Sequence, residues 1–425
     1  MSDLWEGHDF PFLIYKGLEL NFTEVKTQKP INISDISRGD TVALIGDFNP
    51  ETILTFLQLI ELGAIVVPLT VETKKEHEYF FESALVDFVI EDGKVRRRFH
   101  EESNKLLEIL RTESHAGLVL FSTGTTGRPK AILHDLTLFL ERFSTPRPAL
   151  RTINFLLFDH IGGINTLLHT LFNKGVIIAT AERTVDGVLD TCKKYGVEVL
   201  PTTPTFLRLM LISGAVPKKV PSCLRVITYG TERMDQSTLD ELCRLLPHVD
   251  FRQTFGMSEL GIVRVKSESR NSLFMKIGGE GIETRVLGQV LQIRSKTKMI
   301  GYLNAPSPFD DDGWYDTKDI VEVKGEYYKV VGRLSDVINV GGLKFMASEV
   351  ERVVLEFPNV LLVKVIPKDN PITGQHIEVV VQSKSGSSIN RNDLLNYCKD
   401  NLQVHMVPKR VHLKDVNIGH RFKKM

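Results

Sequence analysis

The chain has 425 residues, more than one hydrophobic core usually supports, so we expect at least two domains. Lys and Arg together number 53, as do Asp and Glu, and this balance argues against a nucleic-acid-binding protein, whose surface is usually net basic. The four cysteines form no CxxC pair, which argues against a disulfide framework or a zinc site and favours a cytoplasmic location.

The first 70 residues predict a strand, a helix and a second strand. Thr41–Ile45 has the continuous apolar character of a buried strand, and Ala64–Leu69 has it again. Between them, Asn49 precedes Pro50 and Gly63 follows the apolar run, the order expected of a helix cap, a first turn and a helix end. We expect no signal peptide, because the N-terminus lacks an apolar core. We also expect no membrane span, because the longest apolar stretch, Ile53–Leu69, is too short and too polar.

The same unit recurs in the middle of the chain. A helix is predicted over about Val185–Tyr195, ending at Gly196, and strand Val197–Leu200 follows it. Thr203-Pro204 then begins another helix, and Leu224–Thr228 is again a short apolar strand. Alternating strands and helices indicate mostly parallel sheets flanked by helices.

The pattern changes after about residue 280. Thr284–Ile293 and Ile320–Val331 predict strands joined by short turns, which indicates an antiparallel, β-barrel-like subdomain. The glycine-bounded stretch Gly332–Gly342 separates it from the C-terminal tail. The tail contains, in order, helix Ser348–Glu356, strands Val360–Ile366 and His376–Gln382, and helix Arg391–Leu402. We therefore predict a large α/β domain followed by a small α+β domain.

The segment that best indicates a chemical function follows the apolar run Leu118–Phe121. It has four hydroxyl side chains, two glycines and a lysine: Ser122, Thr123, Gly124, Thr125, Thr126, Gly127, Arg128, Pro129 and Lys130. Glycines let the backbone approach a phosphate, hydroxyls add donors, and Lys130 adds a point charge. The Walker A spacing GxxxxGK[ST] is absent. The segment predicts a polyphosphate-binding loop, with a polar surface turn as the alternative.

Four segments resemble motifs of the superfamily of acyl-CoA synthetases, adenylation domains and luciferases, and they occur in that superfamily's order. Ser122–Lys130 resembles its phosphate loop, and Phe255–Glu259 resembles its aromatic-Gly-x-Thr-Glu motif. Trp314–Asp319 resembles its Tyr-x-Thr-Gly-Asp motif, and Gly332–Gly342 resembles the stretch that joins its two domains. The resemblance runs from about Thr41 to the C-terminus.

This resemblance implies roles for individual positions. Glu259 would help hold Mg²⁺, a hard cation that prefers carboxylate and phosphate oxygens, and Ser258 would contact the α-phosphate. Asp319 would accept hydrogen bonds from both ribose hydroxyls, with Arg333 beside it. Further contacts to ATP or AMP are expected from Ser122, Thr123, Gly124, Thr125, Thr126, Gly127, Lys130, Gly230, Thr231, Glu232, Thr254, Phe255, Gly256 and Met257.

The acyl pocket is expected around Asp159, His160 and Tyr229. The resemblance makes His160 the residue that gates this pocket, while an ordinary core histidine is the alternative. Amino-acid-activating relatives use an aspartate after phenylalanine to bind an α-amino group, as at Asp159. The sequence His160-Ile-Gly-Gly is more similar to the acyl-CoA synthetase version, which favours a substrate without that amine.

The resemblance also implies a mobile C-terminal lid. Residues 1–334 would form the AMP-binding domain and residues 335–425 the lid, with Ser335 as the hinge and Gly341 and Gly342 beside a thiol channel. Lys423 would enter the active site during adenylation and neutralise charge there, with Lys424 as the alternative. Lys130, Glu259 and His160 would complete the catalytic set.

The implied activity is that of an acid–thiol ligase. ATP and Mg²⁺ would convert a small carboxylic acid to acyl-AMP with release of pyrophosphate, and CoA would accept the acyl group. One alternative is a stand-alone adenylation enzyme that loads a phosphopantetheinyl carrier protein. Another is a non-catalytic nucleotide-binding relative, because Lys318 replaces the glycine of the Thr-Gly-Asp motif and the tail after the predicted lysine is shorter than is typical of the superfamily. Ser335 replaces the usual aspartate or lysine of the hinge, but a small residue there can still absorb a change in φ and ψ.

Overall fold

The first strand–helix–strand unit forms as its sequence predicts. The structure, a computed structural model, describes residues 11–21, 31–122, 128–180, 182–384 and 386–416. Helix α2 (Pro50–Leu62) starts at the predicted proline, and the Asn49 side chain accepts a hydrogen bond from the Thr52 N–H at 2.9 Å. Gly63 ends the helix with φ 83°, a left-handed conformation that glycine adopts without a steric penalty.

Helix α2 belongs to the first of two α/β sheets. Within the described residues this sheet has the strand order β20-β8-β7-β4-β3-β5-β6, and β7, β4, β3 and β5 are parallel. Its strands are β3 (Thr41–Ile45), β4 (Ile65–Leu69), β5 (Phe88–Glu91), β6 (Lys94–Arg97), β7 (Gly117–Phe121), β8 (Ala131–Asp135) and β20 (Gly301–Tyr302). The other helices of this region are η2 (Val71–Glu76), α3 (His77–Ala84), α4 (Lys105–Glu113) and α5 (Leu136–Glu141).

The second α/β sheet has the order β13-β12-β11-β9-β10-β1-β2 in the described part of the chain, with β2 antiparallel to its neighbour. Its strands are β1 (Pro11–Tyr15), β2 (Leu18–Asn21), β9 (Arg151–Asn154), β10 (Val176–Ala179), β11 (Val199–Thr202), β12 (Val226–Tyr229) and β13 (Asp250–Gln253). Its helices are α6 (Ile161–Phe172), α7 (Val185–Tyr195), α8 (Pro204–Ile212) and α9 (Gln236–Leu245). The predictions for α7 and the start of α8 are confirmed, whereas β11 begins two residues later than predicted.

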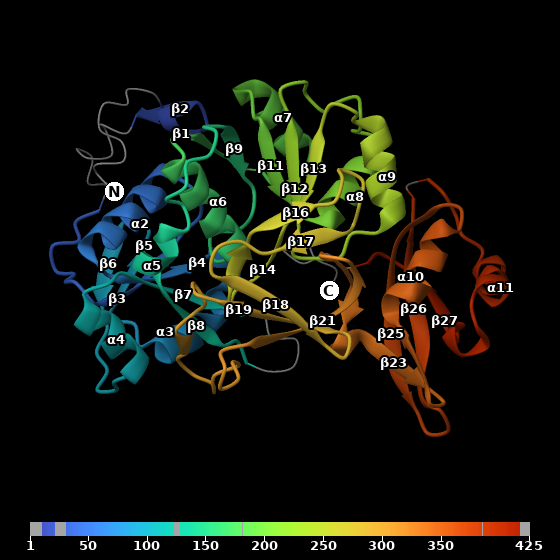
Figure 1. The fold of residues 1–425 in the computed structure, drawn as a ribbon. Coiled ribbons are helices and arrows are strands. Elements are labelled where there is room, and N and C mark those ends of the chain that lie inside the picture. The colour runs from blue at the N-terminus through green and yellow to red at the C-terminus, as the bar shows by residue number, and fades with distance from the viewer. Residues whose placement is uncertain (1–10, 22–30, 123–127, 181, 385, 417–425) are drawn as a thin grey trace.

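The two sheets share a hydrophobic core. One cluster of buried side chains includes Phe56 of α2 and Leu167 of α6, together with Leu118 from the first sheet and Ile177 from the second. These helices therefore pack between the sheets, and the parallel, helix-flanked architecture predicted from the sequence is confirmed (Figure 1).

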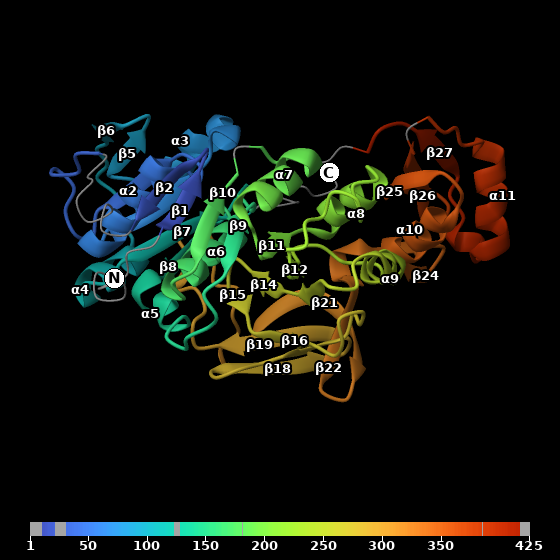
Figure 2. The ribbon, with the colours of Figure 1, turned by 90° about the horizontal axis from the view of Figure 1, so that it is seen from above.

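The antiparallel region predicted after residue 280 is also present. Among the described residues it is an open sheet with the order β16-β17-β22-β21-β19-β18. This sheet corresponds to the predicted barrel-like subdomain. Its strands are β16 (Val265–Ser267), β17 (Met275–Ile277), β18 (Ile282–Leu287), β19 (Val290–Ser295), β21 (Tyr315–Lys324) and β22 (Tyr327–Arg333). A hairpin of β14 (Phe255–Met257) and β15 (Gly261–Val263) precedes this sheet in the sequence. The six-stranded sheet lies along one side of the second α/β sheet (Figure 2).

The C-terminal part is a small α+β unit, drawn in orange and red in Figure 1. It consists of η3 (Leu334–Asp336), β23 (Val337–Val340), β24 (Leu343–Met346), α10 (Ala347–Glu356), β25 (Val360–Asn370), β26 (Gly374–Ser383), α11 (Arg391–Asn401), η4 (Val404–Met406) and β27 (Arg410–Leu413). Both predicted helices are confirmed, and both predicted strands extend beyond their predicted ends. Of the helices that the structure describes, none combines the length and the apolar character needed to cross a bilayer.

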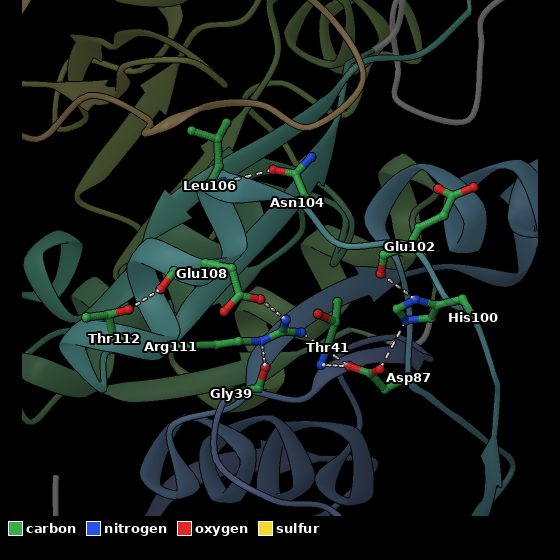
Figure 3. Close-up of polar contacts among 10 residues, drawn as sticks. All are labelled: Gly39, Thr41, Asp87, His100, Glu102, Asn104, Leu106, Glu108, Arg111 and Thr112. Atoms are coloured by element: carbon green, nitrogen blue, oxygen red, sulfur yellow. Dashed lines mark hydrogen bonds and ion pairs between the residues drawn. The ribbon is translucent and has the colours of Figure 1, made fainter.

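A cluster of hydrogen bonds and an ion pair connects α4 to the first sheet. The Asp87 carboxylate, just before β5, accepts the Thr41 N–H at 2.8 Å and lies 3.1 Å from His100 Nε2 (Figure 3). Arg111 of α4 donates to the Gly39 carbonyl at 3.1 Å and lies 3.8 Å from Asp87 (Figure 3). These contacts lie where strands β3 and β5 begin. They therefore stabilise the amino-terminal ends of the parallel strands, which lie opposite to the carboxyl end of β7.

Candidate functional site

The predicted phosphate loop connects β7 to β8, which are antiparallel. Phe121 pairs with Ala131 at the last step of the ladder. Beyond it the Ser122 N–H donates to the Lys130 carbonyl at 3.0 Å, and the Lys130 N–H donates to Ser122 Oγ at 3.0 Å. Both ends of the loop are thus fixed. Its central residues, Thr123, Gly124, Thr125, Thr126 and Gly127, lie outside the described residues.

Two side chains that the sequence analysis did not identify anchor the base of this loop. The Tyr79 hydroxyl of α3 donates to the Pro129 carbonyl at 2.9 Å. Asn304, which follows β20, donates to the same carbonyl at 3.1 Å and accepts the Ala131 N–H at 2.8 Å. The loop is therefore held from a helix about 50 residues before it and from a turn about 170 residues after it.

Glu259 lies in the tight turn between β14 and β15. Met257 pairs with Gly261, so Ser258, Glu259 and Leu260 form a three-residue hairpin loop. Gly261 has φ 72°, the left-handed conformation that such loops require at their end. Gly256 packs so closely against β15 that a Cβ atom there would overlap the Gly261 carbonyl. The glycines of the motif thus set the shape of the turn that presents Glu259.

The Glu259 carboxylate meets two tyrosines. The Tyr302 hydroxyl of β20 donates to Glu259 Oε1 at 2.7 Å, and the Tyr315 hydroxyl interacts electrostatically with the same carboxylate. Burial, and then the negative charge of Glu259, raise the pKa of both phenols, so both remain protonated donors. Lys130 Nζ lies 4.7 Å from the centre of the Tyr302 ring. Tyr302 was also missed by the sequence analysis, because a two-residue strand has no recognisable pattern.

Asp319 and Arg333 face each other across β21 and β22. They are register partners, and Arg333 Nε donates to Asp319 Oδ1 at 3.2 Å. Asp319 is only 5% exposed, and burial raises the pKa of its carboxyl although the charge of Arg333 opposes this. Tyr315 lies four residues before Asp319 on the same strand. This strand therefore connects the predicted ribose-binding carboxylate with the surroundings of Glu259.

Lys318 adopts the conformation that the glycine of the related motif would favour. Its φ is 59°, and its ammonium group contacts Asp316 Oδ2 at 2.6 Å. The Lys318 N–H donates to Asp316 Oδ1 at 2.9 Å, and the Asp319 N–H donates to Thr317 Oγ1 at 3.0 Å. The irregularity in β21 before Asp319 thus forms without a glycine.

The segment Tyr229–Glu232 follows β12 and packs against Thr254. The N–H and the hydroxyl of Thr254 both donate to the Tyr229 carbonyl, at 2.8 and 3.1 Å. A Cβ atom at Gly230 would overlap Thr254, which explains the glycine, and Thr231 has φ 69°. The Tyr229 side chain is 1% exposed and packs in the core of the second sheet.

Glu232 reaches the N-terminus of α8. Its Oε2 atom accepts the Thr205 hydroxyl at 2.6 Å and the Thr205 N–H at 3.2 Å, a favourable position for a carboxylate beside a helix N-terminus. Glu232 and Arg233 also line a cavity together with Glu351 of α10. The structure thus gives Glu232 contacts that the sequence analysis did not foresee.

His160 caps α6. Its Nδ1 atom accepts the Gly162 N–H at 3.0 Å. Asp159, directly before it, is 5% exposed. Gly163 lies so close to Leu157 that a Cβ atom there would overlap the Leu157 carbonyl. The glycines after His160 therefore allow the helix to start tightly against the preceding loop.

The predicted hinge and thiol-channel residues lie at the start of the C-terminal part. Ser335 is in η3, and its hydroxyl donates to Asp336 Oδ1 at 3.0 Å. Gly341 and Gly342 form the two-residue turn between β23 and β24 with φ 62° and 87°, positive values that a hairpin of this kind requires. Lys423 and Lys424 lie outside the described residues.

The chemistry of the donor set fits Mg²⁺. Mg²⁺ is usually held by one or two carboxylates together with substrate phosphates rather than by a cage of protein ligands. Among the described residues no group of three or more His, Cys, Asp or Glu side chains is arranged to hold a metal ion. Glu259 is a single carboxylate near Lys130, so it would bind the ion jointly with a polyphosphate.

Comparisons with known proteins identify the family to which this chain is similar. The profile of the AMP-binding enzyme family matches residues 32–288. A 2-succinylbenzoate–CoA ligase of Bacillus licheniformis is 27% identical over 71% of this chain and 66% of that protein. A 4-coumarate–CoA ligase of Narcissus pseudonarcissus is 25% identical over 73% of this chain and 63% of that protein. The chain thus spans just under two thirds of the length of these relatives.

Solved structures show a similar fold. ATP-bound MatB from Rhodopseudomonas palustris has a TM-score of 0.81 at 20% identity, covering 99% of this chain and 96% of that one. The o-succinylbenzoate CoA synthetase of Bacillus subtilis, in complex with the acyl-adenylate intermediate OSB-AMP, has a TM-score of 0.78 at 18% identity, covering 100% and 96%.

Proposed function

Because the chain belongs to the AMP-binding enzyme family, we propose that it activates a small carboxylic acid with ATP and then transfers the acyl group to the thiol of CoA. One observation carries this proposal: Lys130, Tyr302, Glu259 and Tyr315 form a continuous series of contacts that joins three predicted motifs. Lys130 and Glu259 are 129 residues apart in the sequence and Glu259 and Tyr315 are 56 apart, so motifs that are distant in the sequence meet at one site.

The comparisons support the choice of reaction. The curated relatives that match most of this chain are CoA ligases. Two of the similar structures contain ATP or an acyl-adenylate. The acid differs among these relatives, so the substrate of this chain is stated only as a carboxylic acid.

In the first proposed step, a carboxylate oxygen of the acid forms a bond to the α-phosphorus of ATP, and the bond to pyrophosphate breaks. Lys130 neutralises phosphate charge, and Ser122 and Ser258 donate to phosphate oxygens. Glu259, oriented by Tyr302 and Tyr315, holds Mg²⁺, which offsets the charge of the phosphates when it is bound.

The nucleotide sugar is bound by Asp319 in this proposal. A buried carboxylate can accept hydrogen bonds from both ribose hydroxyls, which offset the cost of burying its charge. Arg333 opposes the effect of burial on the pKa of Asp319, and its hydrogen bond orients the carboxylate. In this proposal the turn with Gly230 and Thr231 lies beside the adenine together with Thr254, which packs against that turn. His160 and Asp159 lie towards the acyl group.

In the second proposed step, the lid formed by residues 335–425 rotates about Ser335, and the CoA thiol attacks the acyl carbonyl of the mixed anhydride. A carbon–sulfur bond forms, the carbon–oxygen bond to the phosphate breaks, and AMP leaves. Lys423 assists the first step and is withdrawn for the second. The Gly341–Gly342 turn moves towards the thiol channel in this rotation.

A mass-spectrometric assay tests the proposal. The protein is incubated with ATP, Mg²⁺ and a panel of carboxylic and amino acids, and acyl-AMP is sought before and after CoA is added. The expected result is acyl-AMP from a carboxylic acid without an α-amino group, which is converted to acyl-CoA. Transfer only to a phosphopantetheinyl carrier protein would favour the carrier-loading alternative, and ATP binding without acyl-AMP from any acid would favour the non-catalytic one.

Paired variants locate the lysine of the first step. Lys423→Ala should sharply reduce formation of acyl-AMP, whereas Lys424→Ala should leave it nearly unchanged. The opposite result would transfer the role to Lys424.

A further inference from the structure

The turn that carries Glu259 is supported by a buried histidine and a partly buried arginine, neither of which has an assigned role. His134 of β8 is 1% exposed, and its Nε2 atom lies 2.6 Å from the Ser258 carbonyl oxygen. Burial lowers the pKa of His134 to about 4, so its ring is neutral at ordinary pH. A carbonyl oxygen only accepts, so Nε2 carries the ring hydrogen and donates it to Ser258.

Arg142, the residue that ends α5, supports the other end of the turn. Its guanidinium lies 3.9 Å from the centre of the Phe139 ring and donates to Thr297 Oγ1 at 2.6 Å. It packs so closely against Gly261 that a Cβ atom there would overlap it. Burial lowers the pKa of Arg142 only to about 10, so the group stays charged.

The segment that Arg142 binds is itself attached to the turn. Two residues after Thr297, the Met299 N–H donates to the Glu259 carbonyl at 2.8 Å. The main-chain carbonyls of Ser258 and Glu259 are therefore both fixed by buried donors, while the Glu259 side chain contacts Tyr302.

We propose that His134 and Arg142 are positioning residues, which fix the Ser258–Gly261 turn so that the Glu259 carboxylate is held in place to bind Mg²⁺ with ATP. This inference rests on the proposed function, because only there does Glu259 bind Mg²⁺. A purely structural role would predict lost stability alone. A positioning role predicts in addition that more Mg²⁺ is needed for ATP to bind.

The test uses three histidine variants of the full chain. His134→Phe keeps the ring volume and removes the donor, and His134→Gln replaces the donor at nearly the same reach. His77→Phe is the matched control, because His77 is also buried and its Nε2 atom lies 2.9 Å from a main-chain carbonyl, that of Thr70. Calorimetry measures ATP binding at increasing Mg²⁺ concentration without any acid, and thermal unfolding is recorded for each variant.

We expect His134→Phe to raise the Mg²⁺ concentration at half-saturation by about fivefold or more, since a hydrogen bond of this kind is lost beneath the turn. His134→Gln should stay close to the unmodified protein. His77→Phe should lower the melting temperature to a similar extent while its Mg²⁺ requirement is unchanged. Should His134→Phe not fold, Arg142→Met, which leaves the Ser258 bond in place, is expected to raise the Mg²⁺ requirement in the same way.

Two results would overturn different claims. An Mg²⁺ requirement of folded His134→Phe or Arg142→Met equal to that of the unmodified protein would overturn the positioning role and leave the proposed function intact. Absence of Mg²⁺-dependent ATP binding in the unmodified protein would instead overturn the proposed function.

Discussion

Replacing Tyr302 by phenylalanine removes a single oxygen atom from the candidate site. That oxygen donates to Glu259 Oε1 at 2.7 Å, and the tyrosine is 6% exposed. The ring remains, so its packing and the position of Lys130 above it are preserved. The variant therefore isolates the hydrogen bond that orients the Glu259 carboxylate.

The size of the effect follows from the kind of bond that is lost. A hydrogen bond to a charged group contributes about 1.5–3 kcal/mol, and each 1.4 kcal/mol corresponds to tenfold in an equilibrium constant. If the bond acts mainly in the nucleotide complex, the dissociation constant for Mg·ATP should rise by about 10- to 150-fold. The free protein also has this bond, so its melting temperature should fall as well, although the apolar contacts of the ring are kept.

Isothermal titration calorimetry with Mg·ATP measures this directly. Tyr328→Phe is the matched control, because the Tyr328 hydroxyl lies 3.1 Å from Thr284 Oγ1, an uncharged partner. We expect unchanged binding for Tyr328→Phe. Binding by Tyr302→Phe as tight as that of the unmodified protein, or an equal loss in both variants, would refute the reasoning.

Three further predictions concern stability. Because Lys318 has φ 59°, Lys318→Gly should be more stable than Lys318→Ala by about 1 kcal/mol, and calorimetric unfolding that shows the reverse order would contradict this. Asp87→Ala leaves the Thr41 N–H without its acceptor and should lower the free energy of unfolding by about 1–3 kcal/mol while Mg·ATP binding is unchanged, as denaturation and binding curves can show. Burial alone would raise the pKa of Asp235, but the charge of Arg208 and their hydrogen bonds hold it well below its usual range. The stabilisation from this pair is therefore fully present above about pH 4 and is lost as the pH falls further. Asp235→Asn should flatten the fall in melting temperature below that pH. An equally steep fall in the variant and in the unmodified protein would contradict this prediction.

Helix ends were predictable because their signals are local. Asn49 and Gly63 cap the two ends of α2 as predicted, and α7 occupies the predicted range Val185–Tyr195. Strand limits were less predictable, because they depend on partners. The Val197 N–H bonds to the Cys192 carbonyl at the end of α7, so the β11 ladder starts only at Val199.

The motifs predicted which segments carry the candidate site, but not what holds them together. Tyr302 meets Glu259 across 43 residues, and Asn304 meets Ala131 across 173. Neither Tyr302 nor Asn304 lies in a motif with a recognisable spacing. Such contacts arise from the packing of whole sheets, which a local pattern does not contain.

Departures from the family motif also required the structure for their interpretation. Lys318 replaces the glycine of the related motif, yet the lysine adopts positive φ and pairs with Asp316. Glu232, predicted near the nucleotide, bonds to Thr205 at the N-terminus of α8. The roles of both residues in nucleotide binding stay predictions.

The most direct test of the central claim is a crystal structure of the protein grown with Mg·ATP. The account predicts that one nucleotide joins the site, with its phosphates between Lys130 and Glu259, the metal ion on the Glu259 carboxylate, and both ribose hydroxyls on Asp319. A nucleotide bound elsewhere, or one whose sugar does not reach Asp319 while its phosphates contact Lys130, would contradict it.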